Sequence, residues 1–120
     1  NARFFTYMEH ARVQYFKRLK ALDLRRMNWQ ETFGFILAEA ACTFKSPAAV
    51  DETLVVGVRV SEVKTRSFIM EYEIREKGSD RLVATARSVQ VMFDYRKNET
   101  FPIPENLRKE VERIESTYSL

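Results

Sequence analysis

The chain has 120 residues, of which 45% are hydrophobic and 31% are charged, and these values fit one soluble domain over residues 1–120. Its net charge of +3 is too small to favour nucleic acid as a partner, and its basic residues are mixed with acidic ones. No apolar run approaches the length of a membrane span, and no signal-peptide pattern opens the sequence, so we expect no membrane partner. The single cysteine, Cys42, excludes an intramolecular disulfide and suits a reducing compartment, so we expect a cytoplasmic protein.

Residues 2–22 are predicted to form the first helix. Asn1 stands just ahead of it, where its side-chain oxygen can accept from a free amide of the first turn. The lone histidine, His10, falls on the polar face of this helix, so we expect it at the surface. Phe5 and Phe16 widen an apolar stripe that recurs at helical spacing. The stripe consists of Phe4, Met8, Ala11, Tyr15, Leu19 and Leu22.

Four long strands are predicted to follow the helix. The first is apolar and aromatic, so we expect it to be buried on much of both faces, and Pro47 ends it. The others alternate apolar and polar residues, with a turn of polar residues and glycine at 77–80 before the last. One face of the last strand is small or polar (Ala84, Ala86, Ser88, Gln90), which indicates close approach by another element or subunit. The four predicted strands cover residues 32–44, 54–61, 68–75 and 82–95.

A final helix is predicted after Pro102 and Pro104, with a thin apolar stripe typical of a surface helix that caps other elements. Its stripe consists of Leu107, Val111 and Ile114. Consecutive strands joined by short turns imply an antiparallel sheet, so the predicted class is α+β. The first helix must bury its stripe against that sheet. One sheet face and one edge then remain uncovered, and dimerisation would cover them.

Three stretches resemble the hotdog-fold thioesterases of the 4-hydroxybenzoyl-CoA thioesterase type, and together they span nearly the whole chain. The most specific is NARFFTYMEHAR at the start of the first helix. FKSPAAVDETLVVGVRV resembles the family's aromatic-x-x-Pro turn and the strand after it, and RLVATARSVQVMFD resembles its last strand. The helix motif is matched by Asn1, Ala2, Phe4, Phe5, Tyr7, Glu9, Ala11 and Arg12.

The resemblance implies a hotdog fold, in which an antiparallel β-sheet wraps a long central helix, here with a C-terminal surface helix. It implies a homodimer or tetramer that hydrolyses an acyl-CoA or a related acyl thioester, without a metal or other cofactor beyond the CoA of the substrate. Family members also carry a strand and an Asp-bearing loop ahead of the helix. We therefore expect that this N-terminal strand is missing from the sequence, and that the main catalytic carboxylate lies upstream of Asn1.

Thioester hydrolysis needs donors for the developing oxyanion and a group that activates water. The free amides of a helix N-terminus are such donors, so we expect the thioester carbonyl near residues 1–3. Asn1 takes part in catalysis there or only caps the helix. Glu9 is the candidate base or nucleophile. However, Arg12 follows three residues later on the same face, and a structural Glu9–Arg12 ion pair is the favoured alternative.

Candidate substrate-binding residues fall into two sets. The basic residues Lys64, Arg66, Arg96 and Lys97 flank strand ends, where they either bind the phosphates of CoA or are solvated turn charges. An aromatic set either lines an acyl pocket or belongs to the core. This set consists of Phe4, Phe5, Tyr7, Phe33 and Phe35.

Other chemistries find little support in the sequence. One histidine and one cysteine provide no zinc ligand set, and Cys42 in its apolar strand is predicted to be a packed, inert thiol. No glycine-rich phosphate loop is present. Two rival functions remain open on this fold. One is an acyl-thioester hydratase or dehydratase, which needs a histidine and a carboxylate near the helix start. The other is a non-catalytic acyl-CoA-binding or assembly module.

Overall fold

The computed structural model describes residues 2–18 and 34–118. Within them, the predicted order of one helix, four long strands and a final helix is confirmed, with one short added strand. The first helix ends at Phe16, and residues 17 and 18 form a turn, so the prediction of a helix to residue 22 is too long; Asn1, Leu19 and Leu22 lie outside the described residues. The elements are α1 (Ala2–Phe16), β1 (Gly34–Phe44), β2 (Leu54–Val63), β3 (Ser67–Glu76), β4 (Leu82–Asp94), β5 (Glu99–Thr100) and α2 (Glu105–Tyr118).

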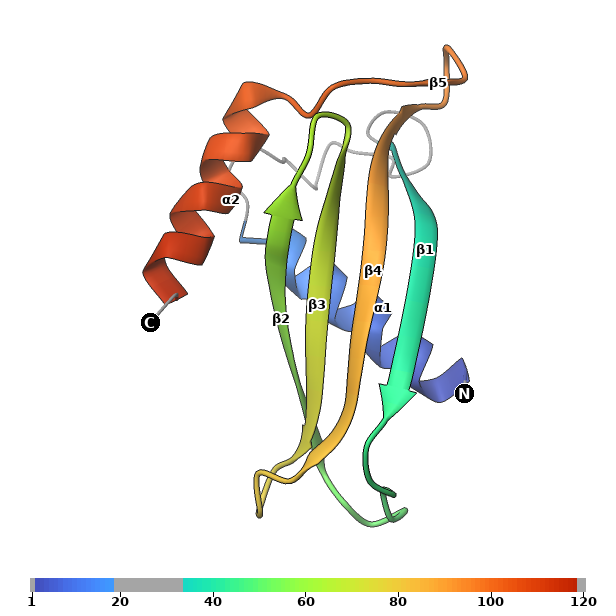
Figure 1. Ribbon diagram of the computed structural model, residues 1–120, viewed down its shortest axis with the longest axis vertical. Helices are drawn as coiled ribbons and strands as arrows, with labels where there is room; N and C mark the ends of the chain where they lie inside the picture. Colours follow the sequence, from blue (N-terminus) through green and yellow to red (C-terminus); the bar gives the residue numbers. More distant parts are fainter. Residues whose placement is uncertain (1, 19–33, 119–120) are drawn as a thin grey trace.

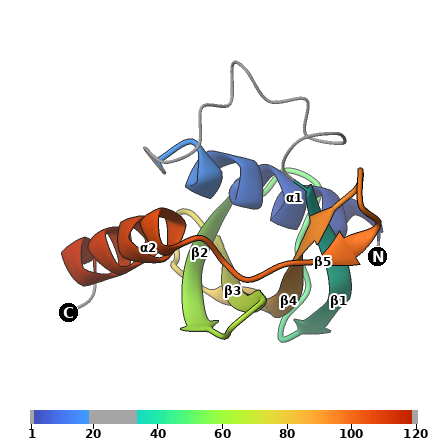
Figure 2. The same ribbon diagram turned by 90° about the horizontal axis from the view of Figure 1, so that it is seen from above.

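The strands form one antiparallel sheet in the order β1-β4-β3-β2, and β5 pairs with the end of β4. Helix α1 lies across one face of this sheet, and α2 lies beside β2 (Figures 1 and 2). The predicted turn at 77–80 joins β3 to β4, and Asp80 adopts the left-handed conformation there, with φ 60°. Neither helix is long and apolar enough to cross a membrane, and the described residues hold no other helix.

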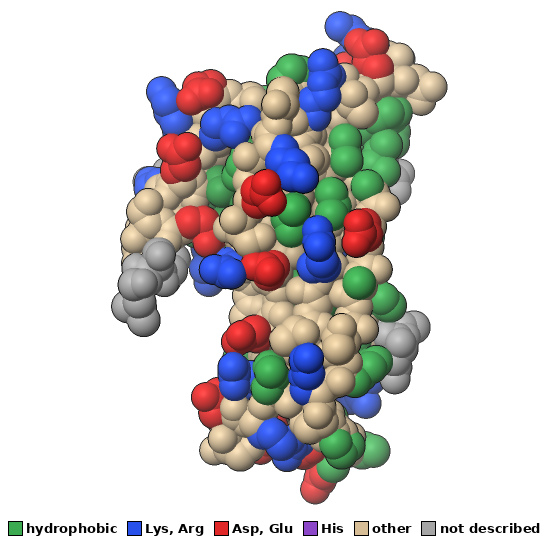
Figure 3. Space-filling view, viewed as in Figure 1, with side chains coloured by type: hydrophobic (Ala, Val, Ile, Leu, Met, Phe, Trp, Pro, Cys, Tyr) green, Lys and Arg blue, Asp and Glu red, His purple; other side chains and the backbone are tan. Residues whose placement is uncertain are grey.

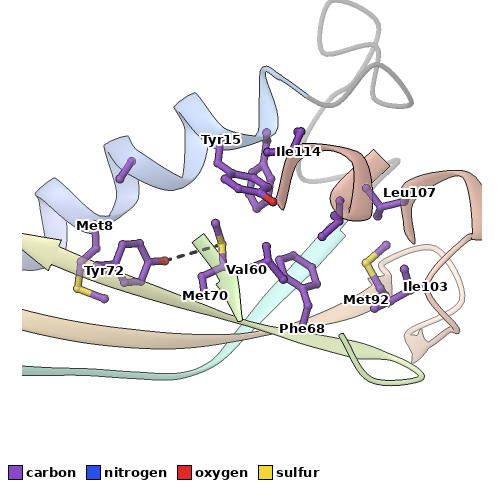
Figure 4. Close-up of a cluster of buried hydrophobic side chains, with 13 residues drawn as sticks. Met8, Tyr15, Val60, Phe68, Met70, Tyr72, Met92, Ile103, Leu107 and Ile114 are labelled. Atoms are coloured by element: carbon purple, nitrogen blue, oxygen red, sulfur yellow. Dashed lines mark hydrogen bonds between the residues drawn. The ribbon is translucent and has the colours of Figure 1, made fainter. Parts of the chain in front are cut away.

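The core lies between α1 and the sheet. Figure 4 shows Met8 and Tyr15 of α1 facing Met70 and Tyr72 of β3, all four of which are buried. The predicted stripe is thus confirmed for its members within α1. Phe5 is an exception, because 40% of its surface is exposed. A helix lying on a flat sheet buries a single stripe, and position 5 falls on the flank of that stripe.

The small and polar face of β4 is turned towards α1, as the sequence indicated. Ser88 and Gln90 are buried on this face. The hydroxyl of Tyr72 shares a hydrogen bond of 2.6 Å with Ser88 Oγ, and Gln90 Nε2 also donates to that oxygen. Arg12 of α1 donates to the Tyr72 hydroxyl at 3.3 Å. A chain of polar groups therefore joins the helix to the middle of the sheet.

Strand β1 is an edge strand, and the prediction that it is buried on both faces is wrong. It pairs only with β4, and Leu37 and Phe44 remain 47% and 51% exposed within the described part of the chain. A continuous apolar run is typical of a strand covered on both sides. Here the same run stands at the end of the sheet, where only one neighbour covers it.

Helix α2 packs along part of β2, which is the strand at the other edge of the sheet from β1. Its predicted stripe, Leu107, Val111 and Ile114, is buried against the core. Glu115 Oε2 accepts a hydrogen bond from the Tyr15 hydroxyl at 2.6 Å and another from the backbone N–H of Val60 at 3.2 Å. One carboxylate thus joins α2, α1 and β2, which confirms the capping role expected for this helix.

Replacing Tyr15 by Phe is expected to lower the free energy of unfolding by about 1–2 kcal/mol near neutral pH, because Glu115 loses a buried donor. Burial and the hydrogen bond to Glu115 raise the pKa of Tyr15 above its ordinary value. The neutral phenol therefore contributes its full stabilisation below about pH 10, and this contribution is lost at higher pH. Urea unfolding near neutral pH and above about pH 10 should show a smaller alkaline loss in Tyr15→Phe.

Tyr7→Phe is the matched control, since the Tyr7 hydroxyl bonds to Arg3 at the surface. Its unfolding free energy should stay within about 0.5 kcal/mol of the wild type. Equal destabilisation in the two variants would argue against a specific role for the contact between Tyr15 and Glu115.

Candidate active site

A hollow of about 570 Å³ lies beside the first turn of α1. Figure 1 shows the start of α1 and the end of β1, which both contribute lining residues, at the lower right. The walls of the hollow come from α1, from the end of β1 and from the loop at 45–49, with Leu54 at the start of β2. The hollow is lined by Arg3, Phe4, Phe44, Lys45, Ser46, Pro47, Ala48, Ala49 and Leu54. Because the first amides of a helix have no partner within it, this wall combines hydrogen-bond donors with an apolar surface.

Aromatic rings form the apolar side of the hollow. Phe4 is buried and packs edge to face against Phe44, with ring centroids 4.9 Å apart, and against Tyr7 at 5.8 Å. The sequence placed Phe4, Phe5 and Tyr7 in one acyl pocket, but only Phe4 lines this hollow. Phe5 points away from the core, and the side chains of Phe33 and Phe35 lie outside the described set.

The charged lining of the hollow is basic. Arg3 and Lys45 lie in its wall, and no carboxylate is among its described lining residues. The Arg3 guanidinium donates to the Tyr7 hydroxyl at 2.8 Å and stands over that ring at 5.7 Å. Lys45 is exposed. Together with the helix N-terminus, these cations favour a ligand that is anionic or develops negative charge.

Glu9 lies on the exposed side of α1, away from the lining of the hollow. The ion pair favoured from the sequence, between Glu9 and Arg12, is wrong, since no bridge joins these two described residues in the structure. Arg12 instead donates a hydrogen bond to the hydroxyl of Tyr72, between α1 and the sheet. The half-buried position of Arg12 explains the difference, because its guanidinium finds an acceptor in the core.

The two turns that carry the four predicted phosphate ligands lie at the opposite end of the sheet from the start of α1 (Figure 1). Lys64 and Arg66 occupy the β2–β3 turn, and Arg96 and Lys97 occupy the β4–β5 turn. Arg66 donates to the backbone oxygen and the hydroxyl of Thr100, at 2.8 and 3.2 Å, so it also ties these two turns together. The structure therefore separates this basic group from the hollow rather than joining them.

A second concavity, of about 600 Å³, runs between α1 and the open edge of β2. His10, Tyr7 and Gln14 line it from the helix, and residues 56–58 line it from the strand. His10 is exposed, as predicted, and lies away from the hollow at the start of α1.

The backbone of β2 has a defined orientation at this edge. The N–H of Val60 points away from β3, because it donates to Glu115 on α2. Backbone groups alternate sides along an antiparallel strand, so the N–H and C=O groups of Val56 and Val58 point away from β3 as well. The carbonyl of Thr53 accepts from Lys77 beyond the end of β3, which agrees with this alternation. The outward N–H and C=O groups of residues 56 and 58 therefore have no partner among residues 2–18 and 34–118.

The outer face of the sheet, turned away from α1, carries interspersed acidic and basic side chains (Figure 3). Arg59 and Glu71 form an ion pair of 2.8 Å on adjacent strands, and Arg87 is the next residue in the same row. Both members of the pair are exposed, so it adds little to stability.

Cys42 is half-buried and packs beside the cluster that contains Phe4 and Ile74. Its packed position is confirmed; burial raises the pKa of its thiol, and an inert thiol stays a prediction. Residues 2–18 and 34–118 contain no group of three His, Cys, Asp or Glu side chains that could hold a metal ion.

The loop that forms one wall of the hollow was not predicted to belong to the site. Phe44 and Pro47 belong to the aromatic-x-x-Pro turn that was recognised in the sequence, but no site role was given to them. The side chains of Arg81 and Glu52, which bond each other at 2.9 Å, were not predicted as part of the site either. The turn motif was the available signal for the wall; the pairing of Arg81 with Glu52 has no local signal.

A family model described as the thioesterase-like superfamily matches residues 1–111. Among solved structures, the chain is similar to a thioesterase from Thermus thermophilus in complex with coenzyme A and zinc. The two are 26% identical, the match covers 97% of this chain and 80% of that one, and the TM-score is 0.80. A search of curated protein sequences finds no significant match.

Two further solved structures share the fold at lower identity. A gentisyl-coenzyme A thioesterase is 23% identical, with 91% of this chain and 82% of that one covered and a TM-score of 0.76. A 1,4-dihydroxy-2-naphthoyl-CoA thioesterase from Synechocystis is 21% identical, with 93% and 83% covered and a TM-score of 0.74. The expected hotdog fold is thereby confirmed.

Proposed function

The chain belongs to the thioesterase-like superfamily, which makes it a thioester hydrolase, and we propose that its substrates are acyl-CoA or related acyl thioesters. The observation that carries this proposal is the hollow of about 570 Å³ at the start of α1. It combines the first amides of α1, which have no partner within the helix, with aromatic and aliphatic walls and two basic side chains. An acyl thioester needs the first two features for its carbonyl and its acyl group, and the cations favour the negative charge that develops on the carbonyl oxygen.

In the proposed reaction, the thioester carbonyl lies at the first turn of α1. Water attacks the carbonyl carbon, a base takes the proton of that water, and the negative charge develops on the carbonyl oxygen. The first amides of α1 stabilise the negatively charged transition state more strongly than the neutral thioester, which lowers the barrier. Collapse of the tetrahedral intermediate breaks the carbon–sulfur bond and releases the free acid and the thiol, which regains the proton.

The base in this proposal is a carboxylate. None of the described residues that line the hollow is Asp or Glu, and Glu9 is exposed on α1. The family resemblance therefore remains the ground for expecting the principal carboxylate upstream of Asn1. Asn1, which precedes α1 in the sequence, stays a candidate for orienting the carbonyl or the water. No metal or redox cofactor is required by these steps.

The substrate is further proposed to be a CoA ester. The Thermus relative was solved with coenzyme A, and the other two relatives are named for aromatic CoA esters. Lys64, Arg66, Arg96 and Lys97 stay predicted ligands for the CoA phosphates. Their position at the far end of the sheet requires the nucleotide to extend away from the hollow, or to reach these residues on another subunit.

The active form is proposed to be at least a homodimer. Support comes from the edge of β2, where the backbone groups of Val56 and Val58 point away from β3 beside the α1–β2 concavity and find no partner in the described part of the chain. An unpaired strand edge next to a partly apolar groove is readily covered by a second copy of the same strand. A cytoplasmic location, expected from the single cysteine, stays a prediction.

Hydrolysis of a panel of acetyl-, hexanoyl-, decanoyl- and benzoyl-CoA, followed by release of free thiol, tests the proposal. We expect turnover of at least one ester with kcat/KM on the order of 10⁴ M⁻¹s⁻¹ or more. Failure of the full-length protein to hydrolyse any of them would contradict it and favour a non-catalytic acyl-CoA-binding module. Hydration of an enoyl-CoA without thiol release would instead favour the hydratase alternative, although His10 lies away from the hollow.

Glu9→Gln, measured in the same assay, separates the two roles considered for this residue. Because Glu9 is exposed and lies outside the hollow, we expect kcat to stay within about threefold of the wild type. General base catalysis contributes about a hundredfold or more, so a loss of that size would identify Glu9 as the base.

A further inference from the structure

One wall of the hollow is a loop that burial does not hold in place. Residues 45–53 join β1 to β2. Ser46 and Glu52 are half-buried, and the other residues of this loop are exposed. The tip of this loop is apolar, yet Val50 is 91% exposed. Loops with few buried apolar contacts open at low cost in free energy unless polar contacts fix them. The position of this wall therefore depends on its hydrogen bonds.

Backbone bonds from Lys45 and Ser46 to the Val83 carbonyl fix the start of the loop, and a single guanidinium contacts three further groups along it. Arg81, in the β3–β4 turn, donates from Nε to Ser46 Oγ at 3.1 Å and from its terminal nitrogen to the Pro47 carbonyl at 3.0 Å. The same terminal nitrogen lies 2.9 Å from both carboxylate oxygens of Glu52. Arg81 thus joins the start of the loop to its end. A lysine at this position has no planar fork and could not hold the three partners in the same way.

The partners of Arg81 are themselves fixed. Ser46 Oγ donates to the carbonyl of Leu82 at 2.8 Å, next to Arg81 in the chain. Glu52 Oε1 accepts a hydrogen bond from the N–H of Ala49 at 2.6 Å. This bond joins the tip of the loop to its C-terminal end. The hydrogen bond from Arg81 lowers the pKa of Glu52, so this carboxylate is ionised at neutral pH. The result is a closed set of polar contacts immediately behind the apolar wall of the hollow.

The residues that this set holds in place are those an acyl group would touch. Pro47, Ala48 and Ala49 line the hollow on the loop side, opposite Phe4 of α1. A shift of this wall would change the width of the hollow between the loop and the helix. It would leave the free amides of the first turn of α1 where they are, because α1 contributes nothing to the bonds of Arg81.

We propose that Arg81 and Glu52 are positioning residues that hold the 45–53 loop as the wall of the acyl subsite and thereby set which acyl groups the enzyme accepts. This inference rests on the proposed thioesterase function. Loss of the wall removes contacts to large acyl groups and leaves the carbonyl-binding end unchanged. The effect is therefore expected in KM for bulky acyl groups and only weakly in kcat for the smallest.

Arg81→Ala is tested against acetyl-CoA and against hexanoyl- and benzoyl-CoA. We expect KM for the two larger esters to rise about tenfold, with kcat for acetyl-CoA within about twofold of the wild type. Arg81→Lys should recover only part of the loss. The matched control is Arg59→Ala, which removes an exposed arginine from an equally short ion pair on the outer sheet face. This variant should keep the wild-type ratio of kcat/KM between large and small esters.

Amide hydrogen exchange supplies a readout that needs no turnover. The N–H of Ala49 should lose its protection in Arg81→Ala and in Glu52→Gln, and keep it in Arg59→Ala. If the wild type is active and Arg81→Ala has the same acyl selectivity, the positioning role is wrong and the proposed function stands. Unchanged amide exchange at Ala49 in Arg81→Ala would also contradict the positioning role. A wild type that hydrolyses no ester would overturn the proposed function, and the selectivity role with it.

Discussion

Replacing Ser88 by Leu is expected to destabilise the protein by about 3–5 kcal/mol, a large fraction of the total stability of a domain of this size. Ser88 lies on the face of β4 that is turned towards α1, and it is fully buried. A leucine there adds three carbon atoms in a space already filled by Tyr72, whose hydroxyl is 2.6 Å from Ser88 Oγ. Overpacking of a core position costs about 1–3 kcal/mol by itself.

The second part of this cost is polar. Without Ser88 Oγ, the Tyr72 hydroxyl and Gln90 Nε2 both lose a buried partner. Each unsatisfied buried group costs about 1–3 kcal/mol, although Tyr72 keeps its contact with Arg12. The two parts are not strictly additive, because a shift of α1 to admit the leucine also changes the reach of Arg12.

Ser88→Ala separates the two parts, since it removes the acceptor without adding volume. It is expected to cost about 1–2 kcal/mol, and the midpoint of urea unfolding should fall while the slope stays constant. Ser88→Leu should lower the midpoint much further. Equal midpoints for the two variants would show that α1 can shift to admit a leucine at no cost in stability. That result would contradict the close approach of α1 inferred from the small residues of β4.

The parts of the fold that were predictable are those set by local periodicity. The stripe of Phe4, Met8, Ala11 and Tyr15 follows from helical spacing, and the alternation along β2 follows from the pleat of a strand. The burial of β1 was not predictable in the same way. An apolar run is compatible with a central strand or with an edge strand, and the pairing that decides between them involves β4, which lies far away in the sequence.

The candidate site shows the same limit. The start of α1 could be located from its motif, because a helix N-terminus has fixed chemistry wherever it occurs. The partner of Arg12 could not, since the local rule of spacing favoured Glu9 while the acceptor in the structure is Tyr72, 60 positions along the chain. Arg81 and Glu52 are likewise brought together only by the folded β3–β4 and β1–β2 connections. Contacts between distant segments override local pairing when they offer a buried acceptor.

Val58→Pro is expected to convert the proposed dimer into a folded monomer. The N–H of Val58 points away from β3, so proline removes no hydrogen bond of the chain's own sheet. In a dimer that pairs two β2 edges, the same proline removes a donor, and its ring blocks the approach of the second strand. With about two hydrogen bonds lost, the dissociation constant should rise by roughly tenfold to a hundredfold.

Arg59→Pro is the informative counterpart, because the alternation of backbone groups directs the Arg59 N–H towards Glu71 of β3. Proline there breaks an internal ladder bond and is expected to lower the free energy of unfolding by about 3 kcal/mol. Val58→Pro should retain most of the wild-type unfolding free energy. Sedimentation at several micromolar concentrations would measure the association, and urea unfolding would measure the stability.

The activity of Val58→Pro then decides whether the dimer matters for catalysis. Strand pairing at β2 would place the second copy beside the concavity lined by Tyr7, His10 and Gln14, on the helix that also carries the proposed carbonyl site. If substrate is held between two copies, kcat/KM should fall in parallel with the fraction of dimer and recover at high protein concentration. A wild type that sediments as a monomer, or a Val58→Pro variant that stays dimeric, would contradict pairing through this edge. A monomeric variant with full activity would instead show that the hollow at the start of α1 functions within one subunit.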